Sequence, residues 1–402
     1  MMGELLFLAH RIPFPPDRGD KIRTFHQLRH LARLGRVNLA CFADDEADAA
    51  NLAGLRQAIG PALGEVHVEV RRTSRIAAGA RALAEGRPVS LTLFDSPALR
   101  GFVERMLGSG RISTIFAFSG QMAQFVPESP GARFVMDFGD VDSAKFEAYG
   151  AEGGLMGPIN RREGRMLAGF ERSVAQRADV SLFVSDAEAE LFRRRSGLRG
   201  ADVRSLQNGV DLDYYDPAAR FPSLDEAGPL IVFTGQMDYA PNIDAVRWFA
   251  GEVMPMLAGA RFAIVGRKPP EAVRRLAGPR VLVTGAVPDV RSWLGAADVV
   301  AAPLRIARGI QNKVLEAMAM ARPVVASPAA FEGIEAEPER HLLVRESAEA
   351  QAEAIAGLLA DRTRAEAMGR SARRRMEEAY RWDSRLAALE ELVGVPPRRA
   401  AA

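Results

Sequence analysis

Short apolar runs alternate with longer amphipathic stretches along this chain, and that alternation constrains its fold more than any other feature. In the first half, the runs with strand character are Glu4–Ala9, Val37–Phe42, Val66–Val70, Thr114–Phe118, Arg133–Asp137 and Val180–Val184. The clearest stretch between them is 20–34, whose apolar residues recur at helical spacing until Gly35 ends the pattern. Strands that alternate with helices in this way predict a doubly wound, mostly parallel sheet.

The alternation stops near 208–211 and resumes after a segment rich in proline and glycine, which is typical of a linker. The second set of strand-like runs is Leu230–Thr234, Phe262–Val265, Val281–Thr284, Val299–Ala302, Val324–Ala326 and His341–Val344. A chain of 402 residues is also too long for one ordinary core. We therefore expect an α/β protein with two Rossmann-like domains that face each other across a cleft.

The expected N-terminal domain covers residues 1–215, and the expected C-terminal domain covers residues 225–378. We expect a helix over 379–395 to return to the first domain. The last residues, 396–402, combine prolines, arginines and alanines, and we expect them to be disordered.

The composition argues against several classes of function. Lys and Arg total 53 against 51 for Asp and Glu, so the balance gives no general case for nucleic acid binding. Cys41 is the single cysteine and cannot form an intramolecular disulfide. The five histidines form no metal-ligand motif such as H-E-x-x-H; His26 and His30 have a spacing that can bind zinc, but no acidic partner is near them. The N-terminal run is too short for a signal peptide, and no apolar run approaches the roughly 20 residues that span a bilayer. We expect a cytoplasmic protein.

The segment from Arg305 to Ser327 gives the strongest indication of a ligand site, because it predicts a helix between two strands. Gly309 lies where that helix is expected to begin, and a helix start favours bound anions such as phosphate. Lys313 falls in the first turn and Glu316 one turn on, which suits a nucleotide's phosphate and ribose hydroxyls. Alternatively, both residues are ordinary solvated side chains near a helix start.

Several segments resemble those of one enzyme family. They are Lys-Val-Leu-Glu-Ala-Met-Ala at 313–319 with Arg-Pro-Val-Val-Ala at 322–326, Leu-Gln-Asn-Gly-Val-Asp at 206–211, Gly-Ala-Val-Pro-Asp at 285–289, Ala-Ala-Asp-Val-Val at 296–300, and Pro-Pro-Asp-Arg-Gly-Asp-Lys at 15–21. Together they resemble the GT-B glycosyltransferases of the retaining "glycosyl transferases group 1" type. More narrowly, 137–143 and 309–313 are similar to sugar transferases associated with PEP-CTERM/exosortase exopolysaccharide systems.

The resemblance implies a donor site that, position by position, falls here on Gly19, Gly235, Arg267, Val287, Gly309, Ile310, Gln311 and Glu316. Glu316 matches the second glutamate of the family's Glu-x7-Glu signature and would bind the ribose hydroxyls. The backbone of 309–311 would hold the diphosphate. Val287 would border the base, Gly235 would line the donor cleft, and Gly19, from the opposite domain, would let its loop approach the phosphate–sugar linkage.

Two positions depart from the family pattern. Arg308 occupies the place of the first glutamate of Glu-x7-Glu, where it could neutralise the leaving diphosphate or simply be a surface arginine. The family's basic pair after Gly235 is missing, because Gln236 follows instead. Arg267 is a candidate substitute for that pair, or a solvated residue. With Lys313, Arg308 is expected to assist departure of the diphosphate.

Three acids, Asp137, Asp140 and Asp142, end a predicted strand and complete the candidate catalytic set. They could orient an acceptor hydroxyl or take its proton. Two such acids could also hold a divalent metal, but the resemblance implies an enzyme without one. Alternatively, Asp142 caps the next helix together with Ser143. His10 and Arg11, which end the first strand, are further candidates for the wall of the cleft.

The resemblance implies transfer of a sugar from a nucleotide-diphosphate sugar to an exopolysaccharide or lipid-linked glycan, without a separate cofactor. Two alternatives remain: a sugar-nucleotide epimerase of the same fold, or a catalytically silent scaffold that binds sugar nucleotides. Because such acceptors are often lipid-linked, peripheral contact with the anionic inner membrane is also expected. The candidate contacts are basic clusters around 71–75, 161–165 and 193–195, each of which could equally be a solvated helix face.

Overall fold

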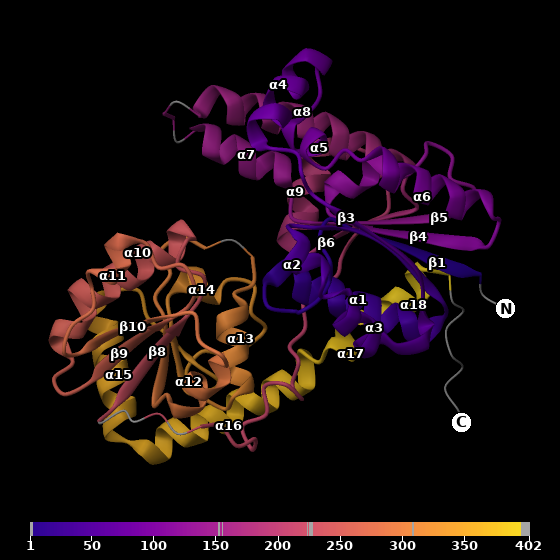
Figure 1. Cartoon of the computed structure of the whole chain (residues 1–402). Helices are drawn as coiled ribbons and strands as arrows, with labels where there is room; N and C mark the ends of the chain where they lie inside the picture. The colour runs from indigo at the N-terminus through magenta and orange to yellow at the C-terminus, as the bar shows by residue number, and fades with distance from the viewer. Residues whose placement is uncertain are drawn as a thin grey trace, which may run out of the picture. The chain divides into compact units, whose positions relative to one another are not determined.

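The computed structural model describes residues 3–151, 153–154, 156–222, 224, 228–307 and 309–394, with the exception of the side chain of Arg75. The chain divides into two compact units (Figure 1). Unit 1 comprises residues 1–207 and 386–402, and unit 2 comprises residues 208–385. Each unit is built around its own parallel sheet, which confirms the predicted α/β class.

Unit 1 contains a seven-stranded sheet in the order β3-β2-β1-β4-β5-β6-β7. Its strands are β1 (Glu4–Ala9), β2 (Val37–Ala43), β3 (Leu63–Val70), β4 (Ile112–Phe118), β5 (Arg133–Gly139), β6 (Val180–Phe183) and β7 (Val203–Ser205). All six predicted strands are present. The sequence pattern missed only β7, which is three residues long and therefore too short to show an alternation.

Helices cover both faces of that sheet. They are α1 (Gly19–Leu34), α2 (Glu46–Ala49), α3 (Leu52–Ile59), α4 (Arg75–Glu85), α5 (Val89–Leu93), α6 (Pro97–Gly108), α7 (Asp142–Ala151), α8 (Gly157–Arg177) and α9 (Asp186–Ser196), with 3₁₀ turns at Gly60–Ala62 and Gly120–Phe125. Because helices lie on either side, the central strand β1 is fully buried from Leu5 to Ala9.

The chain belongs to unit 1 again from Leu386 onward. Around this point it forms two short helices, α17 (Trp382–Leu386) and α18 (Ala388–Leu392), where one helix over 379–395 was expected. Arg133 at the start of β5 donates from Nε to the carbonyl oxygen of Leu392 at 2.6 Å, and Thr114 of β4 donates to the carbonyl oxygen of Val393 at 3.2 Å. The last described turn therefore closes one edge of the unit 1 core.

Unit 2 contains a six-stranded parallel sheet in the order β10-β9-β8-β11-β12-β13. Its strands are β8 (Leu230–Thr234), β9 (Arg261–Val265), β10 (Val281–Gly285), β11 (Val299–Ala302), β12 (Val324–Ala326) and β13 (Leu343–Val344), all within predicted runs or extending them by one residue. Its helices are α10 (Ala240–Trp248), α11 (Glu271–Arg274), α12 (Val290–Ala296), α13 (Asn312–Ala319), α14 (Pro328–Phe331), α15 (Ala348–Ala360) and α16 (Arg362–Ala379), with a π turn at Phe249–Val253 and a 3₁₀ turn at Met254–Met256.

The strand order reverses at β1/β4 in unit 1 and at β8/β11 in unit 2. In open parallel sheets, the carboxyl ends of the strands beside such a reversal form the usual ligand crevice. The connections after β1 and β5 in unit 1, and after β8 and β11 in unit 2, carry most of the predicted site residues. No helix in the described part of the chain is long and apolar enough to cross a membrane.

Candidate functional site

The helix that carries Lys313 and Glu316 begins later than the sequence predicted. It starts at Asn312, and Gly309 lies in the preceding loop with a φ of 66°, in the left-handed region that favours glycine. Gln311 is extended at the N-cap and donates from Nε2 to the carbonyl oxygen of Gly309 at 3.0 Å. The residues 309–311 are therefore a loop that leads into the helix, and Lys313 still falls in its first turn.

Lys313 is held by groups from the neighbouring strand and helix of unit 2. Its Nζ donates to Asn242 Oδ1 at 2.6 Å and lies 4.8 Å from the centroid of the Phe233 ring. Burial lowers the pKa of Lys313 to about 8, against the attraction of Glu316. Asn242 was not predicted as a site residue, although it ends the segment that replaces the family's basic pair. An uncharged amide at this position does not resemble the arginine or lysine expected there.

The packing around position 235 explains why a glycine is required there, which the sequence alone did not show. A Cβ at this position would lie 2.8 Å from Asn242 Nδ2, which donates to the carbonyl oxygen of Gln236 at 2.8 Å. A Cβ on Gly266 would lie 1.6 Å from the carbonyl oxygen of Gly235. Gly266 thus lets the ends of β8 and β9 approach closely, and Gly235 leaves room for the side chain of Asn242.

Glu316 accepts a hydrogen bond from the hydroxyl of Tyr215, a residue from the segment that follows 206–211. Burial raises the pKa of Glu316, while Tyr215 and Lys313 act in the opposite direction. Burial and the nearby carboxylate raise the pKa of Tyr215 well above its ordinary value, so the phenol stays protonated and donates. Tyr215 is therefore the polar partner of the carboxylate that is expected to bind ribose.

The other predicted donor residues of unit 2 lie in connections after strands. Val287, after β10, is partly buried against the unit 2 core. The backbone of Arg267, after β9, accepts from the amide of Met237 at 3.0 Å. Ile310 is also partly buried against that core. Arg308 lies outside the described residues.

In unit 1, Asp137 is fully buried and surrounded by structural partners. Arg23 donates from Nε to Asp137 Oδ2 at 2.9 Å, and Gln27 donates from Nε2 to the same oxygen at 2.5 Å. The other oxygen accepts from the amide of Gly139 at 3.0 Å. This carboxylate joins β5 to α1, since both of its donor side chains come from that helix.

Asp140 and Asp142 have different surroundings. Asp140 is exposed, and Asp142 is the partly buried first residue of α7, 4.0 Å from Lys145. Burial raises the pKa of Asp142 to about 6. Next to it, Glu171 accepts from the amide of Ser143 at 2.9 Å and from its hydroxyl at 2.6 Å, and burial raises the pKa of Glu171 to about 7. An acid with a pKa near neutrality suits proton transfer.

His10 and Arg11 meet the start of α1. Asp20 Oδ2 lies 3.1 Å from His10 Nε2 and accepts from Arg11 Nη1 at 2.7 Å, while Arg18 reaches Asp20 Oδ1 at 2.7 Å. These partners lower the pKa of Asp20 even though burial opposes the shift. Gly19 is the exposed first residue of α1, directly before this cluster.

No group of three or more His, Cys, Asp and Glu side chains among the described residues is placed to hold a metal ion. The chemistry available at the described positions is therefore that of cations, carboxylates and backbone amides. Unit 2 offers an ammonium and a carboxylate one helical turn apart on α13, each held by a neutral polar partner. Such a pair is suited to a phosphate and to sugar hydroxyls.

Comparison with known sequences places this geometry in context. Residues 228–361 match the family model described as "Glycosyl transferases group 1". The chain is 30% identical over 245 residues to a GDP-mannose-dependent alpha-(1-6)-phosphatidylinositol monomannoside mannosyltransferase of Mycobacterium tuberculosis, which covers 55% of this chain and 63% of that protein. It is 28% identical over 301 residues to a phosphatidyl-myo-inositol mannosyltransferase of Mycobacterium leprae, with 69% and 80% covered. The chain thus spans less than two thirds of the first of these relatives.

Solved structures resemble the whole chain. Sucrose-phosphate synthase from Thermosynechococcus elongatus aligns with a TM-score of 0.68 at 17% identity, covering 97% of this chain and 98% of that one. Anabaena HepE in complex with UDP and glucose aligns with a TM-score of 0.67 at 15% identity, covering 98% and 100%. The protein therefore has the GT-B fold. Within this fold, the part that resembles the glycosyl transferases group 1 family is residues 228–361.

Proposed function

We propose that the protein is a retaining glycosyltransferase that moves a sugar from a nucleotide-diphosphate sugar to an exopolysaccharide or lipid-linked glycan acceptor. One observation carries the proposal: Lys313 and Glu316 share one face of α13, where Asn242 holds the first and Tyr215 holds the second. In this arrangement the ammonium binds the diphosphate and the carboxylate binds the ribose hydroxyls. Unit 2 is then the donor unit.

In the proposed reaction, the bond between the anomeric carbon and the diphosphate oxygen breaks, and a bond to the acceptor oxygen forms on the same face of the sugar. Negative charge grows on the leaving diphosphate, and Lys313, Arg308 and the backbone of 309–311 stabilise it. Val287 borders the base, while Gly235 and Arg267 complete the donor site of unit 2. The acceptor hydroxyl loses a proton as it attacks.

Asp142 is the best of the three acids for receiving that proton. The carboxylate of Asp137 is already occupied by Arg23 and Gln27, and that of Asp140 is exposed. Asp142 combines partial burial with a pKa raised to about 6. It is therefore mostly ionised at neutral pH and still basic enough to accept a proton.

The names of the relatives support particular donors and acceptors. The mycobacterial relative is named for GDP-mannose and for a phosphatidylinositol monomannoside, and HepE was solved with UDP-glucose as well as with UDP. We infer a hexosyl donor and an acceptor that carries a lipid. The likeness of 137–143 to the PEP-CTERM/exosortase transferases favours an exopolysaccharide precursor, assembled at the cytoplasmic face of the inner membrane in contact with its anionic lipids.

A thermal-shift panel tests the donor site. UDP-, GDP-, ADP- and TDP-sugars are added to the purified chain, to Glu316→Ala and to Glu353→Ala, which replaces an exposed glutamate on α15. We expect one nucleotide class to stabilise the wild type and Glu353→Ala but not Glu316→Ala. If no nucleotide shifts the melting temperature at millimolar concentration, the donor site is wrong.

Release of nucleoside diphosphate then separates the possible activities. A glycosyltransferase releases it faster when a glycan or lipid-linked acceptor is added. An epimerase would convert the sugar nucleotide without an acceptor, and a binding scaffold would do neither. Either of these two outcomes, together with a positive thermal shift, would overturn the transferase while leaving the donor site in place.

A further inference from the structure

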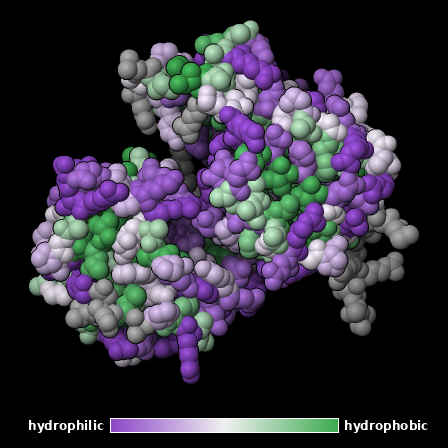
Figure 2. Space-filling model, viewed as in Figure 1, coloured by the Kyte–Doolittle hydropathy of each residue, from purple (hydrophilic) through white to green (hydrophobic). Residues whose placement is uncertain are grey.

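Helix α4 of unit 1 presents its larger apolar side chains to solvent. It buries Ala78 and Ala82 against the unit, while Ile76 and Leu83 are 86% and 67% exposed. These two residues are seven positions apart and therefore lie on one stripe of the helix. In Figure 2, hydrophobic residues gather over the part of the molecule where Figure 1 places α4. Small residues face the unit and large ones face outward, which is the reverse of an ordinary surface helix.

The start of α8 carries two further exposed apolar residues. Arg162 of α8 donates from Nη2 to the carbonyl oxygens of Ala82 and Arg87 at 3.1 and 3.3 Å, so the two helices are joined at the C-terminal end of α4. One turn before Arg162, Ile159 is 49% exposed, and Met156 just before the helix is 56% exposed. We call Ile76, Leu83, Met156 and Ile159 the apolar strip.

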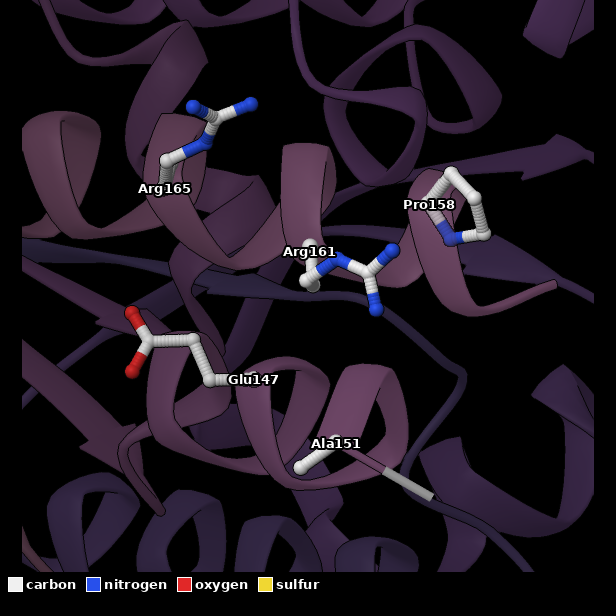
Figure 3. A pocket seen from close by; sticks show the side chains of 5 residues that line it. All are labelled: Glu147, Ala151, Pro158, Arg161 and Arg165. Atoms are coloured by element: carbon white, nitrogen blue, oxygen red, sulfur yellow. The ribbon is translucent and has the colours of Figure 1, made fainter. Parts of the chain in front are cut away.

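A cavity of about 460 Å³ lies between α7 and the same part of α8. It is lined by Glu147, Ala151, Pro158, Arg161 and Arg165, and Figure 3 shows Arg161 and Arg165 one turn apart on α8, above Glu147 and Ala151 of α7. Arg195 of α9 pairs with Glu147 at 2.6 Å and neutralises its charge.

The charge of this cavity is positive. Arg161 donates to the carbonyl oxygen of Gly150 at 2.8 Å, which holds its guanidinium without neutralising it. Within the described part of the chain, neither Arg161 nor Arg165 forms an ion pair. By contrast, Arg71 pairs with Asp44 at 2.8 Å and Arg193 with Glu190 at 3.3 Å. The two arginines that line this cavity have no carboxylate partner among the described residues, whereas the described arginine side chains of the other two clusters each contact one.

We propose that the apolar strip and the α7–α8 cavity form one docking surface for an anionic lipid bilayer, with lipid phosphates bound by Arg161 and Arg165. Apolar side chains beside unpaired arginines are the pattern of helices that lie in a membrane interface, because the side chains enter the acyl region while the cations meet the headgroups. A bilayer with anionic headgroups satisfies both features at once, whereas a protein partner would have to present an apolar face together with carboxylates opposite the two cations. The inference rests on the proposed membrane location and assigns it to particular residues.

Vesicle flotation of the full chain tests the surface. Vesicles contain phosphatidylcholine alone or mixed with phosphatidylglycerol. The variants are Ile76→Ser with Leu83→Ser, and Arg161→Gln with Arg165→Gln. Matched controls in unit 2 are Met256→Ser, at a site 45% exposed, and Arg275→Gln with Arg362→Gln, whose side chains are 76% and 91% exposed.

We expect the wild type to float with the mixed vesicles and to float less at high salt. The arginine variant should lose about fivefold in binding for each arginine. The apolar variant should lose roughly tenfold or more. The controls should bind as the wild type does. Three results would each contradict the docking surface. One is equal vesicle binding by all of the proteins, and another is binding to phosphatidylcholine alone that does not depend on Arg161 and Arg165. The third is a dimer that only the apolar variant disrupts.

Nucleotide-sugar thermal shifts are measured on the same proteins. The docking variants should keep the donor shift of the wild type, because every substituted residue lies in unit 1. Loss of vesicle binding with an intact donor shift then reports on the docking surface alone. Vesicle binding without any donor shift would instead overturn the proposed transferase and leave the docking surface standing.

Discussion

Lys313 Nζ lies 2.6 Å from Asn242 Oδ1, and this contact joins the first turn of α13 to the start of α10. The two residues follow β11 and β8, the neighbouring strands at which the order of the unit 2 sheet reverses. A neutral amide holds the ammonium in place without neutralising it, so its charge stays available to a phosphate. The proposed donor site therefore depends on backbone geometry around Asn242 as much as on the cation itself.

The pH dependence of donor use should report the protonation of Lys313. Its pKa is lowered to about 8, so the ammonium is charged below that pH and loses its proton as the pH rises through it. We expect kcat/KM for the donor to fall above pH about 8. In Lys313→Arg, whose guanidinium stays charged, the fall should disappear even if the rate is lower. A high-pH fall that persists in this variant would assign it to another group.

Gly235→Ala should disturb Lys313 through Asn242. The added Cβ would lie 2.8 Å from Asn242 Nδ2, and overpacking of this kind typically costs about 1–3 kcal/mol. We expect a lower free energy of unfolding in urea and weaker donor binding. Gly251→Ala is the matched control, since its Cβ would meet no heavy atom within 4 Å. Equal stability of both variants would show that Asn242 is not held as described.

Tyr215→Phe should weaken donor binding without unfolding the protein. It removes the hydroxyl that donates to Glu316, a hydrogen bond worth about 1.5–3 kcal/mol when one partner is charged. We expect the donor KM to rise roughly tenfold and kcat to change much less, because ribose is remote from the reacting bond. Tyr214→Phe is the control: Tyr214 is 43% exposed, and this variant should behave as the wild type. A fall in kcat at unchanged KM would contradict a positioning role.

Unit 1 should become less stable as the pH rises from about 4 to about 7. Glu171 has an ordinary pKa of 4.5 that is raised to about 7 in the folded chain, and Asp142 shifts from 3.8 to about 6. In this window each of these two groups binds more protons in the folded state than in the unfolded state, so their contribution to the free energy of unfolding falls with rising pH. Glu171→Gln should reduce the fall in the free energy of unfolding across this pH window by on the order of 2 kcal/mol.

Calorimetric melting between pH about 4 and pH about 7 measures that slope, with Glu353→Gln as an exposed control in unit 2. A slope that Glu171→Gln leaves unchanged would show that Glu171 is already ionised in the folded protein. The mutation preserves one acceptor for the Ser143 amide at 2.9 Å, so simple loss of packing is not expected.

The sequence predicted the sheets of both units because buried parallel strands are continuous apolar runs with clear ends. It failed where side chains do not follow that pattern. In α1, the apolar residues Phe25 and Leu28 are buried as predicted, but Arg23 and Gln27 are buried too. They serve the carboxylate of Asp137, which lies more than a hundred positions away, and no local period indicates such a partner.

The candidate donor site could likewise be predicted only in part from the sequence. The position of Lys313 and Glu316 on one helix followed from their spacing. Their partners Asn242 and Tyr215 did not, because each contact depends on how separate strands and loops meet. The helix was also predicted to begin too early: nothing in the sequence showed that Gly309 adopts a left-handed φ of 66°, which excludes it from the helix.

The return of α18 to unit 1 has a consequence for the order of folding. Leu389 and Leu392 are buried in unit 1, yet they follow the whole of unit 2 along the chain. During synthesis, the sheet of unit 1 therefore emerges from the ribosome long before the segment that bonds to the N-terminal ends of β4 and β5 at Thr114 and Arg133. The acceptor half of the proposed enzyme cannot be finished until the donor half has been made, so a prematurely terminated chain would expose an incomplete core to proteolysis.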